Sequence, residues 1–336
     1  MGPEGTPFPA LSIAPLGHGS PGRGPRVPPM PARPRTVKPG LHARNRHRRG
    51  YELPRLVTAY PALRPFVIRT PTGEATVDFA DPRAVLALNT ALLRVDYGVR
   101  QWDLPPGFLC PPVPGRADYL HVLADLLARG AGGVIPRGPT VRILDLGVGA
   151  NLIYPLIGHR EYGWSFIGSE IVPEALVHGR RILAANPDLA AVIDLRFQAR
   201  PMALLEGILG AEETVTAVIC NPPFHVSAGQ AAAGTRRKLQ NLGHGRGGPP
   251  VLNFGGQAPE LWCAGGELGF IGRLIDESAA RPQAARWFTT LVSQDAHLPP
   301  LRAALAGHRA QVEVLPMAQG NKRSRLLAWR FPGPVC

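Results

Sequence analysis

The residues Asn221-Pro222-Pro223-Phe224 come directly after the apolar run 215–220, which has the composition of a buried strand. The carboxyl ends of strands are where open α/β sheets bind ligands. The side-chain oxygen of Asn221 and the backbone carbonyl of Pro222 are both acceptors, and the prolines hold them on a stiff, non-helical backbone. Two fixed acceptors suit a flat amino group with two N–H donors, and Phe224 offers a ring for stacking. The motif therefore indicates methylation of a conjugated nitrogen, although a simple strand-terminating turn uses the same residue types.

The chemistry predicted for this motif depends on alignment. A conjugated nitrogen is a poor nucleophile because its lone pair is delocalised into the ring. Holding both N–H bonds and bringing the nitrogen in line with a methyl donor can lower the barrier by about 7 kcal/mol or more in the best-oriented systems. A strong general base is not needed, since the proton can leave after the methyl group arrives.

A second motif has the residue types to hold the methyl donor. The segment 140–146 is predicted to be a buried strand, and it leads into a turn in which Asp145 precedes Gly147 and Gly149. Glycines at such a turn let a ligand approach the backbone closely. A dinucleotide fingerprint would have a third glycine where this chain has Leu152. The Asp-x-Gly-x-Gly form instead resembles the S-adenosylmethionine loop of the Rossmann-like methyltransferases.

Beyond residue 141 the chain alternates between strand and helix patterns. This alternation predicts an α/β fold with a mostly parallel seven-stranded sheet and helices on both faces. Together with the Asp-x-Gly-x-Gly turn, the pattern resembles a Rossmann-like class I methyltransferase. Ahead of it, helices are predicted over residues 81–93 and from Arg116 onward, after the proline-rich turn 110–115. The candidate strands are 141–146, 165–170, 193–198, 215–220, 287–292, 311–315 and 326–331.

Composition divides the chain into three parts. Residues 1–40 are rich in glycine and proline and lack periodicity, which predicts a disordered basic arm. Residues 41–135 are predicted to form an N-terminal accessory segment that binds RNA, and residues 136–336 the methyltransferase domain. An insertion at 225–263, rich in glycine, basic residues and amides, is predicted to cover the target nucleotide; a surface loop without a role is the alternative.

The chain of 336 residues carries a formal net charge of +13, and its basic residues are clustered. Such clusters suit the phosphate backbone of a nucleic acid, and polyanion binding accounts for all of them together. A merely solubilising tail is the alternative for the first cluster. The predicted RNA-binding residues are Arg44, Arg46, Arg48 and Arg49 near the N-terminus, Arg236, Arg237 and Lys238 in the insertion, and Lys322 and Arg325 near the C-terminus.

Cysteine usage and hydropathy bear on the compartment. The four cysteines include no Cys-x-x-Cys pair and have no histidine at zinc-finger spacing, which favours a reduced cytoplasmic chain without structural metal. No apolar stretch approaches the length needed to span a membrane, so a soluble protein is expected. We also expect a monomer.

Longer segments carry a resemblance that covers the chain from about residue 39 to 331. They include GLH and RNRH near residues 40–47, VDFA at 77–80, CPPVPGRADY at 110–119, IGHREYGW at 157–164, CNPPFH at 220–225, RRKL at 236–239, LNFGG at 252–256 and MAQG at 317–320. Together they resemble the bacterial 23S ribosomal RNA adenine-N6-methyltransferase family. Members of that family methylate the exocyclic N6 of one adenine in the large-subunit RNA. The resemblance implies S-adenosyl-L-methionine as cofactor, and 23S ribosomal RNA or the pre-ribosomal large subunit as partner.

Carried over residue by residue, the resemblance implies roles for the candidate site. Asn221 and the Pro222 carbonyl would accept the two N6–H bonds of adenine, Pro223 would stiffen the turn, and Phe224 would stack on the ring. A contact to the cofactor adenine is expected within residues 198–202. The cofactor-binding residues would be Arg116 at the cofactor carboxylate, Asp145, Gly147, Gly149 and Asn151 in the pocket, and Glu170 at the ribose, where other members more often carry Asp.

Other functions share these motifs. A protein-glutamine methyltransferase uses a similar Asn-Pro-Pro-aromatic turn, usually with Tyr, and has no need of basic clusters. An N6-adenine methyltransferase acting on another structured RNA or on DNA would use the same chemistry. A non-catalytic, RNA-binding ribosome assembly factor with a vestigial pocket is the alternative from another class. The intact motif residues argue against it: Asp145, Gly147, Gly149, Asn221 and Phe224.

Overall fold

The computed structural model of the chain describes residues 40–223, 263–319 and 322–332. These residues belong to the compact unit Thr36–Cys336. The predicted disordered arm, apart from Gly40, and the predicted insertion, apart from Cys263, lie outside the described residues. Four of the candidate site residues lie outside them as well: Phe224, Arg236, Arg237 and Lys238.

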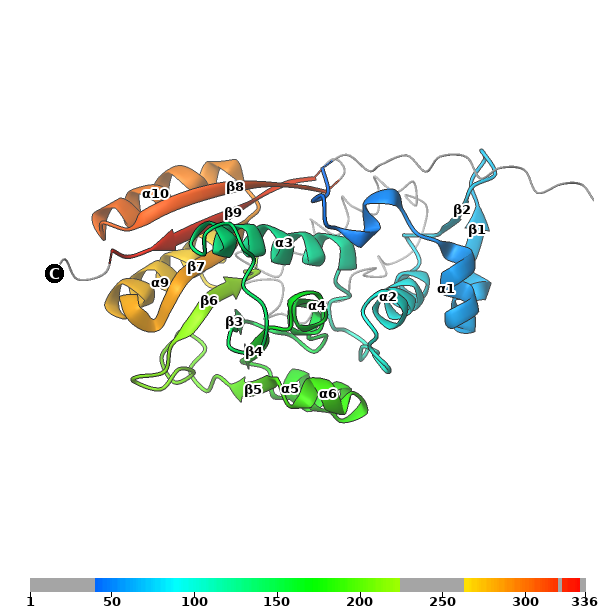
Figure 1. Ribbon diagram of the computed structural model, residues 1–336, viewed down its shortest axis with the longest axis horizontal. Coiled ribbons are helices and arrows are strands. Elements are labelled where there is room, and N and C mark those ends of the chain that lie inside the picture. Colours follow the sequence, from blue (N-terminus) through cyan, green and yellow to red (C-terminus); the bar gives the residue numbers. More distant parts are fainter. Residues whose placement is uncertain (1–39, 224–262, 320–321, 333–336) are drawn as a thin grey trace, which may run out of the picture. The chain divides into compact units, whose positions relative to one another are not determined.

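A seven-stranded sheet forms the centre of the structure, with the strand order β5-β4-β3-β6-β7-β9-β8 (Figure 1). Neighbouring strands from β5 to β7 are parallel, and β9 is antiparallel to both of its neighbours. Every strand of this seven-stranded sheet overlaps a predicted one, so the predicted mostly parallel sheet is confirmed. The bounds are β3 Arg142–Leu146, β4 Ser165–Glu170, β5 Ile193–Phe197, β6 Val215–Cys220, β7 Ala285–Val292, β8 Gln311–Gln319 and β9 Lys322–Arg330.

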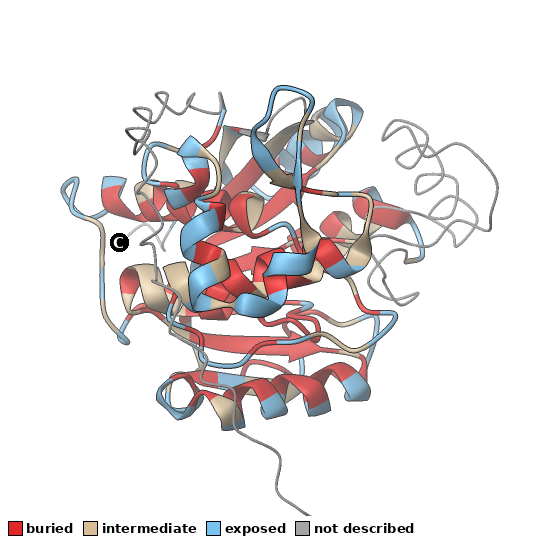
Figure 2. Cartoon of the chain, turned by 90° about the vertical axis from the view of Figure 1, so that its right-hand side faces the viewer, coloured by how far each residue is buried: buried red, intermediate tan, exposed pale blue. Residues whose placement is uncertain are grey.

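Strands β3 and β6 are buried almost throughout because helices cover both faces of the sheet. Alternate residues of β6 enter different hydrophobic clusters. Ala217 and Ile219 pack with α3 and α4, whereas Val218 and Cys220 pack with α9 and α10. Figure 2 shows buried strands between helices whose outer sides are exposed. The helices are α3 Val113–Arg129, α4 Ile153–Tyr162, α5 Pro173–Ala185, α6 Pro187–Ala190, α9 Gly266–Ala280 and α10 Leu298–Gly307, with short 3-10 turns η3 Pro282–Ala284 and η4 Asp295–His297.

The segment ahead of the sheet contains two further helices and a two-stranded hairpin (Figure 1). Leu56 of α1 and Leu92 of α2 are buried in the same cluster as Ile143 of β3. The hydrophobic core is therefore continuous across the boundary at residue 135, and the division into domains stays a prediction. The bounds are η1 Arg46–Arg49, α1 Leu53–Ala59, η2 Pro61–Phe66, β1 Val67–Arg69, β2 Ala75–Val77 and α2 Pro82–Asp96, of which α2 is the predicted helix at 81–93.

Helix α3 begins earlier than the sequence predicts. The proline-rich segment 110–115 is predicted to be a turn, but Pro114 and Gly115 lie in the first turn of the helix. A proline there lacks only an N–H that has no intrahelical partner in any case, and its fixed φ suits the helix. Arg116 is thus held on a regular helix, three residues ahead of Tyr119.

An ion-pair network joins β3, β5 and the turn before β6. The Glu213 carboxylate accepts hydrogen bonds from Arg196 Nη1 at 2.5 Å, Arg196 Nη2 at 2.9 Å and Arg142 Nη2 at 2.7 Å. The bonds from Arg196 are the main cause that lowers the pKa of Glu213 to about 2. We expect Glu213→Gln to lower the free energy of unfolding at neutral pH by on the order of 1 kcal/mol, because solvent screens this partly exposed network.

The contribution of Glu213 should depend on pH with a definite sign. Its pKa is lower in the folded state than its ordinary value of 4.5, so its stabilisation is complete above pH 4.5 and is lost as the pH falls towards about 2. Urea denaturation of wild type and Glu213→Gln should therefore give free energies that converge over this range. Glu212→Gln, which removes an exposed neighbouring carboxylate, serves as control. Equal stabilities of wild type and Glu213→Gln at neutral pH would contradict the prediction.

Candidate active site

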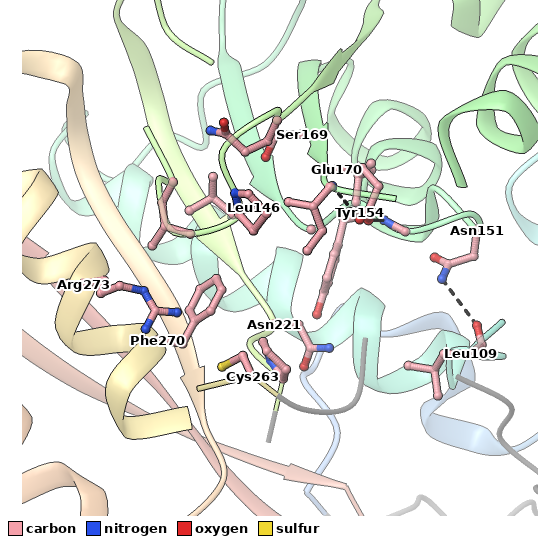
Figure 3. A pocket seen from close by; sticks show the side chains of 18 of the residues that line it. Leu109, Leu146, Asn151, Tyr154, Ser169, Glu170, Asn221, Cys263, Phe270 and Arg273 are labelled. Carbon is pink, nitrogen blue, oxygen red and sulfur yellow. Dashed lines mark hydrogen bonds between the residues drawn. The ribbon is translucent and has the colours of Figure 1, made fainter. Parts of the chain in front are cut away.

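A pocket lies at the carboxyl ends of β3, β4 and β6, on either side of the point where the strand order reverses. Its volume is about 330 Å³, within the range of small-molecule sites. Helices α3, α4 and α9 also contribute to its walls (Figure 3). Seven of the predicted site residues meet there: Arg116, Gly147, Gly149, Asn151, Glu170, Asn221 and Pro223.

The glycine turn after β3 has the conformation that its residue types require. Gly147 and Gly149 have φ angles of 73° and 65°, in the left-handed region that favours glycine. The N–H groups of Gly147 and Val148 donate to the Ser169 carbonyl at 3.0 and 2.9 Å, which ties the turn to β4. Asn151 ends the turn by accepting the N–H of the first residue of α4 at 3.0 Å. The turn therefore forms one rigid wall of the pocket.

Glu170, the last residue of β4, connects this turn to the strand through hydrogen bonds. It is 6% exposed, and its Oε2 accepts the Gly149 N–H at 2.9 Å. Its Oε1 accepts the N–H groups of Ile171 and Val172 at 2.7 and 3.0 Å. Burial raises the pKa of Glu170, and these backbone bonds oppose the rise. Three bonds use most of the acceptor sites of a carboxylate and leave capacity for one more donor from a ligand.

Arg116 supplies positive charge to the pocket. Its Nη1 donates to the Tyr154 hydroxyl oxygen at 3.0 Å, and its guanidinium lies 5.5 Å from the centre of the same ring. Within the part of the chain that the structure describes, Arg116 makes no ion pair. A fixed guanidinium of this kind suits a carboxylate on a ligand.

Asp145 is placed differently from the other candidates. It is 1% exposed at the end of β3, and it is not among the residues that line the pocket. Neither carboxylate oxygen has a hydrogen-bond partner among the described residues. Burial raises the pKa of Asp145 well above its ordinary value, while Arg116 acts in the opposite direction. Asp145 thus lies beneath the glycine turn rather than on the pocket surface.

Asn221 presents an unsatisfied acceptor at the other end of the pocket. It follows β6 directly and lines the pocket with Pro223, while Pro222 is buried. The Asn221 Oδ1 atom is buried and has no hydrogen-bond partner among the described residues. A buried amide oxygen without a partner is costly, so this atom is available for an N–H donor from a ligand.

Helix α9 contributes residues that the sequence did not single out. Phe270 and Arg273 line the pocket, with the guanidinium 5.6 Å from the ring centre (Figure 3). Cys263 lines it near Asn221. The helix follows the insertion, so no motif marks these side chains in advance.

The loop between β5 and β6 lines the pocket and is fastened to α9. Gln198, within the expected range 198–202, lines the pocket and donates from Nε2 to the Glu206 carbonyl at 2.9 Å. The Glu277 carboxylate of α9 accepts three consecutive backbone N–H groups of this loop, at 2.8, 2.7 and 3.2 Å. The three donors are Leu204, Leu205 and Glu206. Glu277 thus holds two walls of the pocket together.

Three of the six predicted RNA-binding residues that the structure describes form ion pairs within the protein. Arg44 donates to Asp125 Oδ1 at 2.7 Å, and Arg46 donates to Glu161 Oε1 at 2.5 Å. Arg325 donates to Asp295 Oδ2 at 2.6 Å. The others are Arg48 and Arg49, which are exposed on η1, and Lys322, which begins β9.

Two kinds of feature are missing from the described residues. Within 40–223, 263–319 and 322–332, no group of three or more His, Cys, Asp or Glu side chains could hold a metal ion. No helix in these ranges is long and apolar enough to cross a membrane.

Comparison with solved structures defines the class of the fold. The hMettl16 catalytic domain in complex with a MAT2A 3′UTR hairpin is similar with a TM-score of 0.72 and 29% identity, covering 88% of this chain and 97% of that one. The N-terminal domain of human METTL16 in complex with SAH is similar with a TM-score of 0.68 and 28% identity, covering 87% and 99%. The strand order, the glycine turn and the pocket are those of a class I methyltransferase.

Sequence comparison narrows the class to a family. A family model described as RNA methyltransferase matches residues 35–333. The ribosomal RNA large subunit methyltransferase F of Ectopseudomonas mendocina is 52% identical over 318 residues, 91% of this chain and 96% of the relative. The protein of that name from Pseudomonas aeruginosa is 50% identical over 308 residues, 90% and 91% of the two chains. The chain belongs to this RNA methyltransferase family.

Proposed function

We propose that this chain transfers a methyl group from S-adenosylmethionine to the exocyclic N6 of one adenine in 23S ribosomal RNA. The observation that carries the proposal is the buried, unpartnered Oδ1 of Asn221 at the pocket. An amino group of adenine would satisfy this atom. The relatives named as large-subunit ribosomal RNA methyltransferases support RNA as the substrate over DNA or a protein glutamine.

The described pocket fits the methyl donor. Arg116 suits its carboxylate, the remaining acceptor site of Glu170 suits its ribose diol, and the glycine turn admits it close to the backbone. Gln198 and the apolar residues of its loop suit the adenine ring. The donor supplies a methyl group activated by a sulfonium. METTL16, similar in fold over nearly its whole domain, has been solved in complex with SAH, which supports the assignment.

Catalysis by this chain would consist of alignment and desolvation. The Asn221 oxygen and the Pro222 carbonyl would accept the two N6–H bonds, and Phe224 would stack on the ring. The stiff Pro222-Pro223 backbone keeps both acceptors in place without cost at the moment of transfer. The described pocket walls are mostly apolar, which excludes water from the reacting nitrogen. No protein group needs to remove a proton beforehand.

Substrate binding would involve residues outside the pocket. The target adenine must leave its stack to reach Asn221, so recognition would use unpaired RNA. We propose that residues 41–135 form an RNA-binding accessory segment, that the insertion covers the target nucleotide, and that the basic clusters hold phosphates. We propose a monomer that acts in the cytoplasm, where ribosomal subunits assemble.

Methyl transfer to unmodified RNA tests the proposal. Labelled S-adenosylmethionine is incubated with wild type and with naked 23S RNA or pre-ribosomal particles, and the product nucleosides are identified by mass spectrometry. We expect N6-methyladenosine at one site, and none with Asn221→Ala. A different methylated nucleoside, or transfer only to DNA or to a protein, would overturn the proposal. RNA binding without transfer to any of these substrates would favour an assembly factor.

The three hydrogen bonds that Glu277 accepts from the loop between β5 and β6 lead to a prediction for cofactor binding. Glutamine at this position keeps one acceptor oxygen but places an amide NH2 against backbone N–H groups. We expect Glu277→Gln to raise the KM for S-adenosylmethionine about 5- to 10-fold, equivalent to the loss of about one hydrogen bond, with kcat changed less than about twofold. Steady-state kinetics measures this, with Asp276→Asn on the exposed side of α9 as control. A fall in kcat at unchanged KM would contradict the proposed role of Glu277 in holding the pocket walls together for cofactor binding.

A further inference from the structure

One fully buried side chain of α3 reaches the end of β6. Tyr119 is 0% exposed, and its hydroxyl oxygen accepts the Cys220 backbone N–H at 3.1 Å. The same oxygen lies 2.9 Å from Oγ1 of Thr289, which donates its own proton to the Val218 carbonyl at 2.8 Å. Since the Thr289 proton is used there, Tyr119 must donate to Thr289. The two hydroxyls form a directed chain of hydrogen bonds that begins and ends on β6.

These bonds lie where the pairing between β6 and β7 ends. The paired residues stop at Val218 and Phe288, whereas β6 stays paired with β3 as far as Cys220. Val218 and Cys220 are two residues apart, so their backbone groups face the same side of the strand. On that side Thr289 bonds with Val218, the last residue of β6 that is paired with β7, and Tyr119 bonds with Cys220, which lies beyond that pairing. Cys220, the last residue before Asn221, is therefore paired with β3 on one side and hydrogen-bonded to Tyr119 on the other.

The same helix also positions the opposite side of the pocket. Arg116 precedes Tyr119 by three residues, a spacing that puts both on one helix face. The Tyr154 ring, whose hydroxyl receives the bond from Arg116, packs edge-on against the Tyr119 ring, with centroids 5.3 Å apart and an angle of 81°. Tyr154 and Asn221 both point into the pocket (Figure 3). Tyr119 therefore contacts the strand that carries Asn221 and the residue that holds Arg116.

We propose that Tyr119 is a positioning residue for methyl transfer, because its hydroxyl, together with that of Thr289, sets the position of Asn221 relative to Arg116. The inference rests on the proposed function, in which the target amino group binds at Asn221 and the donor carboxylate at Arg116. A shift of about 1 Å between reacting groups costs about 100-fold in rate. The hydroxyl is buried behind the pocket wall and touches neither substrate, so substrate affinities should change little.

Removal of the single hydroxyl tests this role. Tyr119→Phe keeps the ring and leaves the Cys220 N–H without its partner. We expect kcat to fall about 10- to 100-fold, while the KM for S-adenosylmethionine and for RNA stays within about threefold. Thr289→Val removes the second hydroxyl and keeps the shape of the side chain, and it should lower kcat by a similar factor. Thr289→Ser keeps that hydroxyl and should retain a kcat within about threefold of wild type.

A matched variant separates positioning from stability. Ser278 is fully buried near the end of α9, and its Oγ accepts the Trp329 Nε1–H at 2.9 Å. Ser278→Ala likewise leaves a buried N–H without a partner, and it should lower the melting temperature but not kcat. A kcat of Tyr119→Phe within twofold of wild type would overturn the inference, as would an equal loss of kcat in Ser278→Ala. A wild type without methyl transfer would overturn the proposed function itself.

Discussion

Replacing Asn221 by alanine is expected to lower kcat for methyl transfer about a thousandfold or more. The variant loses the buried acceptor at the pocket, so one N–H of the target amino group has no partner and the nitrogen is no longer held in line. Binding of S-adenosylmethionine should stay within about threefold, because Arg116 and Glu170 are unchanged. Single-turnover rates with saturating RNA measure the transfer step, and calorimetry measures cofactor binding.

Two further substitutions at Asn221 distinguish the effect of its hydrogen-bond acceptor from the effect of its side-chain volume. Aspartate keeps an oxygen of similar placement and should transfer methyl groups faster than alanine. Leucine keeps the approximate volume but no acceptor, and should be as slow as alanine. A leucine variant faster than the aspartate variant would show that filling the site, rather than accepting a hydrogen bond, is what matters.

The second large effect is expected at Glu170. Glutamine at this position has one acceptor oxygen in place of two, and its NH2 group would face a backbone N–H at Gly149 or at Ile171. The glycine turn and the ribose acceptor would be disturbed together. We expect the dissociation constant for S-adenosylmethionine to rise about 100-fold, which corresponds to about 2.7 kcal/mol, or about two hydrogen bonds. Calorimetric titration of the purified variant measures it.

A matched charge control accompanies Glu170→Gln. Glu174 is an exposed carboxylate in the first turn of α5, four residues further along the chain. Glu174→Gln removes the same charge without touching the turn, and its affinity should equal that of wild type. Binding by Glu170→Gln within about threefold of wild type would mean that the carboxylate does not contact the donor.

The sheet could be predicted from the sequence because its strands are apolar runs that end in turn residues. β4 and β6 match their predicted bounds, and the alternation with helices determines that these strands are parallel. The hairpin β1–β2 was not predicted, since its strands are three residues long and too short to show a period. The start of α3 cannot be placed from the sequence, because proline and glycine are typical of turns as well as of a helix's first turn.

The candidate site was predictable where its residues follow strands directly. Glu170, the glycine turn and Asn221 all lie at strand ends, which meet at one edge of a parallel sheet. Phe270 and Arg273 were not predictable, because they reach the pocket only when the chain returns after the insertion. The ion-pair partners of Arg44 and Arg46 could not be predicted either, because they lie 81 and 115 residues away along the chain.

The ion pairs of the basic residues change how RNA affinity should respond to salt. A phosphate that takes the place of the carboxylate at Arg44, Arg46 or Arg325 sets that carboxylate free. The RNA then releases a condensed cation, but the freed carboxylate attracts a cation from solution, so little net ion release results. Exposed arginines such as Arg48 and Arg49 give the full release. The net charge of +13 therefore overstates the number of counterions that drive binding, and the affinity should depend on ionic strength less steeply than that charge suggests.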